Sequence, residues 1–533
     1  MDTKALRQKI LDLAIRGKLV PQDPNDEPAS VLLERIRQQK QQMVKEGKLK
    51  PKDIKNDSVI FVGEDNLHYE KFADGSVKCI EDEIPFDLPE GWAWAFLSNI
   101  VYVLNGDRGQ SYPAKSKLRS KGIPFVSASN IQDGVVSSDG LLCLSDSQYD
   151  ALGAGKLFAG DIVYCIRGSL GKCGLFTMEK GAIASSLVIV RSLFDAPHII
   201  DYIFLYLNSA LAAGEIKKYD NGSAQPNLAA KDFRHFLVPL PPQAEMQRIN
   251  KQAREALVFV KRIQNNKDEL HAAIAVAKSK ILDLAIHGQL VPQDPNDEPA
   301  SVLLERIRAE KEELIKQGKI KRDKKESVIF RGEDNSYYLR TGELVESLED
   351  WDFEELPDSW SVCCLGELCD YGNCTNIDTA DIADSAWILD LEDIEKDSGV
   401  VLQKVRQGER NAGSTKHRFH KGQVLYSKLR PYLNKVVLAD EDGYCTSEIL
   451  PLEFERNILP QYARYFLMSP AFLRYANKCS YGVKMPRLGT TDGKKAIISV
   501  PPVKEQKRII MAIELAFAQL ASIAENLAYN KCT

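Results

Sequence analysis

Several features that would place this chain in a common class of protein are missing from its 533 residues. No stretch approaches the roughly eighteen consecutive apolar residues that a membrane span requires, so no transmembrane segment is predicted. The eleven cysteines are scattered and odd in number, which favours reduced thiols in a cytoplasm over a disulfide framework. The net charge of −5 excludes a uniformly basic coat for nucleic acid, although local basic patches remain compatible with it.

Sequence signatures of catalytic sites are missing as well. GSLGKCG at residues 168–174 lacks the leading glycine of a phosphate-binding loop, and LGAGK at residues 152–156 is too short for a dinucleotide fingerprint. The Pro-Pro pairs lack the neighbouring residues with which amino-methylating enzymes hold a flipped base. A cluster of four cysteines does not have the spacing of a zinc site: Cys363, Cys364, Cys369 and Cys374. These absences predict a non-catalytic protein without a cofactor or metal of its own.

The chain does contain a duplication. LVPQDPNDEPASVLLERIR occurs at residues 19–37 and again, identical at all nineteen positions, at residues 290–308. Other matched segments are KILDLAI with its copy, SVIFVGEDN with SVIFRGEDN, DLPEGW with ELPDSW, and PLPPQAEMQRI with SVPPVKEQKRI. Similarity is nearly absent between the middles of the two units, roughly residues 93–220 and 361–480. Matching ends predict contacts with two copies of one partner, or with each other, whereas unlike middles predict two different targets.

A long helix is predicted where the two units join. After Pro242, apolar residues recur at alternating spacings of three and four, a strong coiled-coil pattern. The predicted seam is Met246, Ile249, Ala253, Ala256, Val260, Ile263, Lys267, Leu270, Ile274, Ala277, Ile281 and Leu284, in which Lys267 alone is not apolar. No Pro or Gly interrupts it before Gly288, so a helix of about 43 residues and roughly 65 Å is expected.

The two ends of the chain carry matching seams. Positions from Ile509 to Leu527 repeat the register of the first half of the central helix, and Leu6, Ile10 and Leu13 repeat that of its second half. Each terminal helix is short for independent stability, so we expect both to pack against the central helix. The predicted arrangement is a pseudo-circular ring of antiparallel helices with approximate two-fold symmetry. A plain core helix would also explain the apolar periodicity.

The middle part of each unit is predicted to be a strand-rich globular domain. Short β-type runs alternate with Gly, Asn and Asp turns and are followed by a helix, which predicts the α+β class. Polar residues gather in the predicted loops. Residues 404–435 hold nine Lys or Arg against Glu409 alone. Arg and Lys suit guanine edges and phosphates, and Asn and Gln suit adenine edges.

We therefore predict a DNA-facing surface in each half. The candidates in the first are Arg108, Gln110, Ser129, Asn130, Arg167, Ser169, Lys172, Ser223, Gln225 and Asn227. The candidates in the second are Lys416, Arg418, His420, Lys428, Arg430, Lys435, Lys484 and Arg487. Ordinary solvated loop groups would explain any one of them singly; their clustering in both halves favours DNA.

The layout as a whole resembles the DNA specificity subunit of type I restriction-modification enzymes. Each globule opens with an LPxxW entry (residues 88–92 and 356–360) and leads to a G-x-x-x-P-x-L loop (residues 222–228 and 482–488). Each then closes on a Pro-rich segment that enters a helix. The second loop, GVKMPRL, differs from the first, GSAQPNL. The repeated segments after each helix resemble a longer-than-usual connector.

The resemblance implies a non-catalytic subunit with two target-recognition domains, each reading one half of a split DNA site. The helices would set the unread spacer, and the duplicated ends would bind two adenine methyltransferase subunits. That assembly would recruit ATP-dependent restriction subunits, and S-adenosylmethionine, ATP and magnesium would belong to those partners. The expected segments are 1–17 terminal helix, 18–83 connector, 84–244 first target-recognition domain, 245–287 central helix, 288–351 connector, 352–504 second target-recognition domain and 505–533 terminal helix.

Two other classes of protein are alternatives to this family. A self-sufficient methyltransferase or nuclease is disfavoured by the missing motifs. A coiled-coil adaptor that joins two protein partners is the stronger alternative, and it would show no salt-sensitive, sequence-dependent DNA binding.

Overall fold

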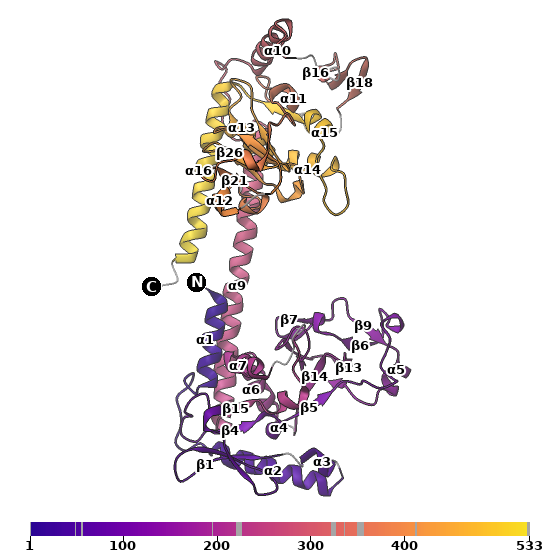
Figure 1. Ribbon diagram of the computed structural model, residues 1–533, viewed down its shortest axis with the longest axis vertical. Coiled ribbons are helices and arrows are strands. Elements are labelled where there is room, and N and C mark those ends of the chain that lie inside the picture. Colours follow the sequence, from indigo (N-terminus) through magenta and orange to yellow (C-terminus); the bar gives the residue numbers. More distant parts are fainter. Residues whose placement is uncertain are drawn as a thin grey trace. The chain divides into compact units, whose positions relative to one another are not determined.

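The computed structural model describes residues 2–47, 49–54, 57–193, 196–219, 226–320, 327–334, 336–348, 356–410 and 413–529 (Figure 1). It divides into two compact units, Asp2–Lys267 and Asp268–Thr533, which we call the N-terminal and C-terminal units. The 44-residue helix α9 (Gln243–Ile286) begins in the first and ends in the second. Two strand-rich domains with a long helix between them in the chain confirm the predicted α+β class, while the circular closure stays a prediction.

The elements of the two units follow a similar order. The N-terminal unit holds α1 (Thr3–Ile15), α2 (Ala29–Lys45), α3 (Pro51–Ile54), β1 (Val59–Val62), β2 (His68–Lys71), β3 (Val77–Cys79), β4 (Ala93–Phe96), α4 (Leu97–Ile100), β5 (Val101–Asn105), β6 (Ile123–Val126), β7 (Ile131–Gln132), β8 (Val135–Val136), β9 (Leu142–Leu144), α5 (Asp146–Ala151), β10 (Lys156–Phe158), β11 (Ile162–Cys165), β12 (Cys173–Leu175), β13 (Lys180–Ile183), β14 (Leu187–Ser192), α6 (Pro197–Leu207), α7 (Ala210–Tyr219), α8 (Ala230–Arg234) and β15 (Leu237–Leu240). After α9, the C-terminal unit holds α10 (Ala300–Lys316), β16 (Ser327–Arg331), β17 (Tyr337–Thr341), β18 (Leu344–Ser347), β19 (Ser361–Cys364), α11 (Leu365–Leu368), β20 (Asn376–Ile377), β21 (Trp387–Leu389), β22 (Val405–Arg406), α12 (Gln407–Arg410), β23 (Lys416–Phe419), β24 (Val424–Ser427), β25 (Val436–Leu438), β26 (Gly443–Thr446), β27 (Ile449–Leu452), α13 (Pro460–Leu467), α14 (Pro470–Lys478), α15 (Thr490–Lys495), β28 (Ile497–Val500) and α16 (Val503–Tyr529).

Sheets in both units obey one plan with different detail. The N-terminal unit has the meander β1-β2-β3, the pair β15-β4, a six-stranded sheet β5-β14-β11-β12-β8-β7 and a four-stranded sheet β10-β13-β6-β9. The C-terminal unit has the meander β16-β17-β18, the pair β19-β28, a five-stranded sheet β20-β23-β26-β21-β22 and a three-stranded sheet β25-β24-β27. The antiparallel pairs β15-β4 and β19-β28 bring the start and end of each middle together. The first and last strands of each middle are thereby paired with each other, directly before the chain enters α9 or α16.

Burial along α9 follows the predicted seam. Each apolar seam residue is buried or half-buried, whereas Lys267 is exposed. In the N-terminal unit Thr3 is hydrogen-bonded to Gln264, and Leu11 shares a core cluster with Met246, so α1 runs antiparallel to α9. Figure 1 shows the two helices side by side. The seam prediction is confirmed there because the 3-4 spacing keeps one stripe facing the neighbouring helix.

The C-terminal helix packs in the same sense in its own unit. Ile509 and Ile513 share a core cluster with Leu282, and Lys278 lies over the ring of Phe517, 5.3 Å from its centroid. The start of α16 is therefore next to the end of α9. This helix and the end of α9 lie alongside each other in Figure 1.

By length and composition, the segment Val503–Asn526 of α16 could cross a membrane, although it contains no uninterrupted apolar run of the length that the sequence analysis looked for. Alanines alternating with Ile and Leu raise its apolar content, and only Glu514 and Glu525 are charged after Arg508 in that segment. The pair α6–α7, bent by 65°, passes the same test only if both helices count as one span.

The identical segment is anchored by the same contacts in both units. In the N-terminal unit, Gly17 follows α1 with a φ of +65° and lies so close to Pro89 and Trp92 that a Cβ at this position would be 2.7 Å from the proline ring. Farther along, Asp26 pairs with Arg248 of α9 at 2.6 Å. We call residues 16–30 the first joint.

The second joint, residues 287–301, repeats this geometry. Gly288 has a φ of +69°, and a Cβ there would lie 2.5 Å from the ring of Pro357 and 3.2 Å from Trp360. Asp297 pairs with Arg508 at 2.7 Å. The identity of the two joints therefore has a structural cause within the chain: each must fit the same Pro, Trp and Arg.

A buried carboxylate supports each joint. Glu245 accepts a hydrogen bond from Trp92 Nε1 at 3.0 Å, and Glu505 accepts one from Gln293 Nε2 at 2.6 Å. Burial raises the pKa of both carboxyl groups above the ordinary value of 4.5. Glu245 thus holds the tryptophan that packs against Gly17 of the first joint, and Glu505 holds Gln293 of the second joint.

Candidate nucleic-acid interface

Three backbone segments form one edge of the N-terminal middle. The Ile166 amide donates to the carbonyl of Ser186 at 3.0 Å, and the Leu228 amide donates to the carbonyl of Ile166 at 2.9 Å. The Gly168 amide donates to the carbonyl of Pro226 at 3.0 Å. Three distant parts of the sequence are therefore joined side by side: residues 166–168, 185–186 and 226–228. We call the surface that they form the edge of this unit.

Several predicted DNA-binding residues lie on this edge. Arg167 Nε donates to Asn227 Oδ1 at 3.1 Å, so these two candidates hold each other in place. Lys172 Nζ donates to the carbonyl of Ala128 at 2.9 Å, which ties the loop after β11 to residues 127–130. The turn between them is closed by the Lys172 amide, which donates to the carbonyl of Ser169 at 3.2 Å.

Other candidates of this unit are placed at its border. Arg108 Nη2 lies 3.5 Å from the carbonyl of Ser185, and Gln110 is exposed two residues farther on. Ser129 lies in an exposed turn, whereas Asn130 is buried and its side chain accepts a hydrogen bond from the Ser127 amide at 2.9 Å. Ser223 and Gln225 lie outside the described residues.

Asp107 is a residue of this region that the sequence reasoning missed. Its carboxylate accepts backbone hydrogen bonds from Gly109 at 2.7 Å and from Gly153 at 2.8 Å. These bonds hold the pKa of Asp107 below its ordinary value. An Asp two residues before a Gly is a turn signal in the sequence, but its second partner comes from a distant loop.

The C-terminal middle builds the same edge with other side chains. The Lys428 amide donates to the carbonyl of Glu448 at 3.0 Å, and the Leu488 amide donates to the carbonyl of Lys428 at 3.0 Å. The Arg430 amide donates to the carbonyl of Pro486 at 2.7 Å. These three bonds match those of the N-terminal unit one for one.

The side chains on the two edges differ in charge, and the two backbones differ in strain, although the three hydrogen bonds are the same. Arg487 binds Glu448 through Nη2 at 2.7 Å, and this hydrogen bond lowers the pKa of the carboxyl group. Asn227 is in the place of Arg487 in the N-terminal unit. Arg430 has a φ of +50° where the other unit has Gly168 at +79°. A non-glycine residue in this region is strained, and such strain is concentrated at functional sites.

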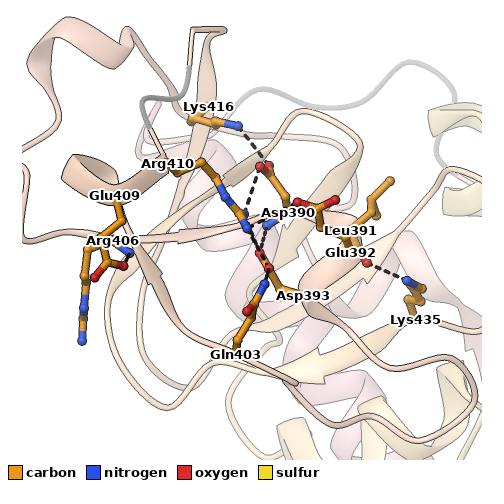
Figure 2. Close-up of polar contacts among 10 residues, drawn as sticks. All are labelled: Asp390, Leu391, Glu392, Asp393, Gln403, Arg406, Glu409, Arg410, Lys416 and Lys435. Atoms are coloured by element: carbon orange, nitrogen blue, oxygen red, sulfur yellow. Dashed lines mark hydrogen bonds and ion pairs between the residues drawn. The ribbon is translucent and has the colours of Figure 1, made fainter. Parts of the chain in front are cut away.

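Carboxylates outside the basic run, residues 404–435, pair with four of its nine Lys or Arg in the described structure: Lys404, Arg406, Arg410 and Lys416. Figure 2 shows the pairs of the last two. Asp393 is fully buried and accepts from Arg410 at 2.5 and 2.8 Å and from Gln403 at 3.0 Å. Burial raises the pKa of Asp393, but these bonds and one from the Asp390 amide outweigh it, and the pKa is lowered. The pair is therefore ionised and structural.

The sequence predicts that Lys416 and Lys435 lie in loops and face solvent. The structure places both ammonium groups elsewhere. Lys416 lies on β23, is 3% exposed, and binds Asp390 at 3.0 Å. Lys435 Nζ donates to the carbonyl of Leu391 at 2.6 Å, and burial lowers its pKa (Figure 2). Both ammonium groups are directed into the protein because β21 and the turn after it supply acceptors that a linear charge count does not reveal.

The other cations of the C-terminal middle differ in their surroundings, and Lys421 of the run is exposed. Lys404, Arg406 and His420 pair with carboxylates of the turn 440–442. Arg418, Arg430 and Lys484 are exposed, and Lys428 is half-buried. These four, with Arg487, are the cations that border the edge and its neighbouring strand β23.

Cysteines of the cluster near the start of the C-terminal middle belong to its core. Cys363, Cys364 and Cys369 are buried, and burial raises their pKa, that of Cys364 to about 12. Among the described residues, no group of three or more His, Cys, Asp or Glu is placed to hold a metal ion. The three cysteines are therefore protonated thiols that pack in the core.

Comparisons with known proteins agree with the doubled layout. Residues 89–270 and 357–523 match the family described as type I restriction modification DNA specificity domain. The chain is 30% identical over 413 residues to the type I restriction enzyme EcoEI specificity subunit of Escherichia coli, covering 68% of this chain and 61% of that one. It is 31% identical over 421 residues to the EcoAI specificity subunit of Escherichia coli, covering 69% and 63%.

The chain thus spans about three fifths of the length of these two relatives. It is also similar to a chain in a solved structure that concerns complex assembly and conformational transition of the type I R-M system. That similarity has 16% identity and a TM-score of 0.48, and it covers 84% of this chain and 95% of the other.

Proposed function

Because the chain belongs to the family of type I restriction modification DNA specificity domains, as its layout predicted, we propose that it is the sequence-specific DNA-binding subunit of a type I restriction-modification complex. Each strand-rich middle reads one half of a bipartite DNA site. The helices set the spacer between the halves and bind two adenine methyltransferase subunits. The chain performs no chemistry itself.

One observation carries this proposal: both units build the same polar edge from the same three backbone hydrogen bonds and fill it with different side chains. A shared frame places each edge in an equivalent position on its own unit. Unlike side chains, such as Asn227 in one and Arg487 in the other, would then read unlike bases. A protein adaptor would have no use for this combination.

The exposed and half-buried residues at each edge and its border are the proposed DNA contacts. In the N-terminal unit they are Arg108, Gln110, Ser129, Arg167, Ser169, Lys172 and Asn227, together with Ser223 and Gln225 from the sequence prediction. In the C-terminal unit they are Arg418, His420, Lys428, Arg430, Lys484 and Arg487. We assign Asn130, Lys416 and Lys435 to support of these residues, because Asn130 and Lys416 are buried and the Lys435 ammonium is directed into the protein.

The partners follow from the duplication and the family. The equivalent ends of the two units are the proposed contacts of two copies of the methyltransferase subunit. Restriction subunits join that assembly, and S-adenosylmethionine, ATP and magnesium bind to these partners. The site of action is the cytoplasm. The proposed recognition domains are residues 84–244 and 352–504.

Mapping of methylated adenines across the genome, in cells with and without this chain, tests the proposal. We expect one bipartite motif to disappear with the chain. Arg167→Ala should relax the motif in one half only, and Arg430→Ala in the other half only, because a lost base contact costs about 1–3 kcal/mol of discrimination. Lys396→Ala, a surface variant paired with Asp397, is the control. A motif unchanged by loss of the chain would contradict the proposal.

An adaptor without DNA reading is the remaining alternative. It predicts that DNA binding by the purified complex is absent, or is equal for all sequences. The specificity function predicts a preferred duplex whose affinity falls steeply with salt.

A further inference from the structure

A short loop beside the C-terminal edge presents apolar side chains to solvent. In residues 481–487, Tyr481 is 62% exposed, Met485 is 44% exposed, and Val483 at the tip is 101% exposed. Scattered exposed apolar residues need no explanation, but three within five positions at the end of a projecting loop form a patch. Such a patch indicates a contact with another molecule.

The loop is held in its projecting form by its own hydrogen bonds. Tyr481 and Arg487 exchange two backbone bonds, at 3.1 and 2.9 Å, which close the base of the loop. Gly482 has a φ of +97°, and a Cβ there would lie 3.2 Å from the Met485 carbonyl. Arg487 Nη1 donates to that same carbonyl at 3.2 Å. The tip is thus preorganised, which lowers the entropy cost of inserting it into a partner.

Positive charge surrounds this apolar tip. Lys484 lies between Val483 and Met485 and is exposed. Arg430 is attached to the loop by its amide, which donates to the Pro486 carbonyl, and Lys428 is attached through the Leu488 amide. An apolar point flanked by cations is complementary to a base stack flanked by phosphates.

Resting on the proposed function, we propose that residues 481–487 act as a wedge that enters the base stack of duplex DNA at the half-site read by the C-terminal unit. Val483 and Met485 would lie against an opened base step, and Lys484 and Arg430 would meet the flanking phosphates. Apolar side chains that insert in this way unstack a step and kink the duplex. The half-site should therefore contain a flexible pyrimidine–purine step.

The test separates apolar insertion from phosphate contact. The full-length chain first selects a duplex from a random pool, and that duplex then carries dyes at its ends for energy transfer and 2-aminopurine within the half-site. The wedge variant is V483S/M485S, the charge variant is Lys484→Ala, and the control is Leu344→Ser, at a 59% exposed leucine of the meander β16-β17-β18. Thermal melting verifies that all three are folded.

We expect the wedge variant to bind about 10-fold more weakly with an unchanged salt slope, because the lost contact is apolar. It should also lose the kink and the 2-aminopurine signal. Lys484→Ala should keep the kink and reduce the salt slope by about 1, since one phosphate contact is lost. Leu344→Ser should behave as the unmodified chain.

Three outcomes would overturn the wedge. In the first, V483S/M485S keeps both affinity and kink. In the second, it loses affinity together with salt dependence, which would make the loop a phosphate contact. In the third, DNA binding is unchanged but capture of the methyltransferase subunit is lost, which would make the tip a protein contact. In all three the selected duplex remains bipartite, so the proposed function stands; if the unmodified chain selects no sequence at all, the proposed function itself fails.

Discussion

Substitution of the glycine in the second joint should destabilise the C-terminal unit far more than its backbone conformation alone requires. Gly288 and Gly318 share a φ of +69°, but a Cβ at Gly288 would lie 2.5 Å from the ring of Pro357, whereas a Cβ at Gly318 would meet nothing within 4 Å. The proline ring cannot rotate away as a flexible side chain can. The pair therefore separates steric cost from conformational cost.

Gly318→Ala should cost about 1–2 kcal/mol, the penalty of a left-handed backbone for a residue with a Cβ. Gly288→Ala should cost this amount and about 1–3 kcal/mol more, because the added methyl overpacks the joint. Since about 1 kcal/mol shifts the melting temperature by roughly 2–4 °C in units of this size, the two variants should be separated by several degrees.

Scanning calorimetry of the full-length chain measures this difference. The first joint offers an independent repeat with Gly17→Ala against Gly47→Ala, since Gly47 has a φ of +72° and open space around it. Equal shifts for a joint glycine and its partner control would refute the reasoning that close packing on Pro and Trp fixes the joint.

Two further predictions concern buried charges. Arg410→Ala should cost about 3–5 kcal/mol, because Asp393 would be left buried without its partner, whereas Arg406→Ala, which breaks an exposed pair, should cost about 0–1 kcal/mol; urea unfolding measures both, and similar costs would contradict the structural role of the first pair. The raised pKa of Glu245 means that folding favours its protonated form, so its contribution to stability falls as pH rises above 4.5, the ordinary value. Glu245→Gln should therefore gain stability relative to the unmodified chain between acid and neutral pH, and a constant difference across that range would show that this carboxyl does not titrate on unfolding.

The fold was predictable wherever a periodic pattern was imposed by one neighbour. The 3-4 seam of α9 depends on local spacing alone, and it predicted burial at Met246 and Val260, whereas Lys267, which was placed in the seam as its one non-apolar position, is exposed. The matched LPxxW and Pro-Pro segments marked where each middle starts and ends, but they did not predict the antiparallel pairing of that start with that end, β4 with β15 and β19 with β28. The information for the seam lies in the order of residues along the chain.

The candidate site was only partly predictable, because its environment is assembled from distant segments. A count of charges along residues 404–435 could not reveal that Asp393 and Asp390 lie against Arg410 and Lys416. The left-handed backbone of Arg430 has no sequence signal either, since its cause is a bond to Pro486, more than fifty residues away. Such pairings depend on strand order, which composition does not encode.

The duplicated joint has a consequence for how new variants of this protein arise. Each joint supplies a glycine. The globule that packs on it supplies a Pro-x-x-Trp entry, and the following helix supplies an acid and an arginine three residues apart, as in Glu245 and Arg248. A globule that carries these few features would fit either joint, whatever its other residues are. Exchange of a whole globule would leave both joints intact, and under the proposed function it would change one half of the preferred motif in a single genetic event.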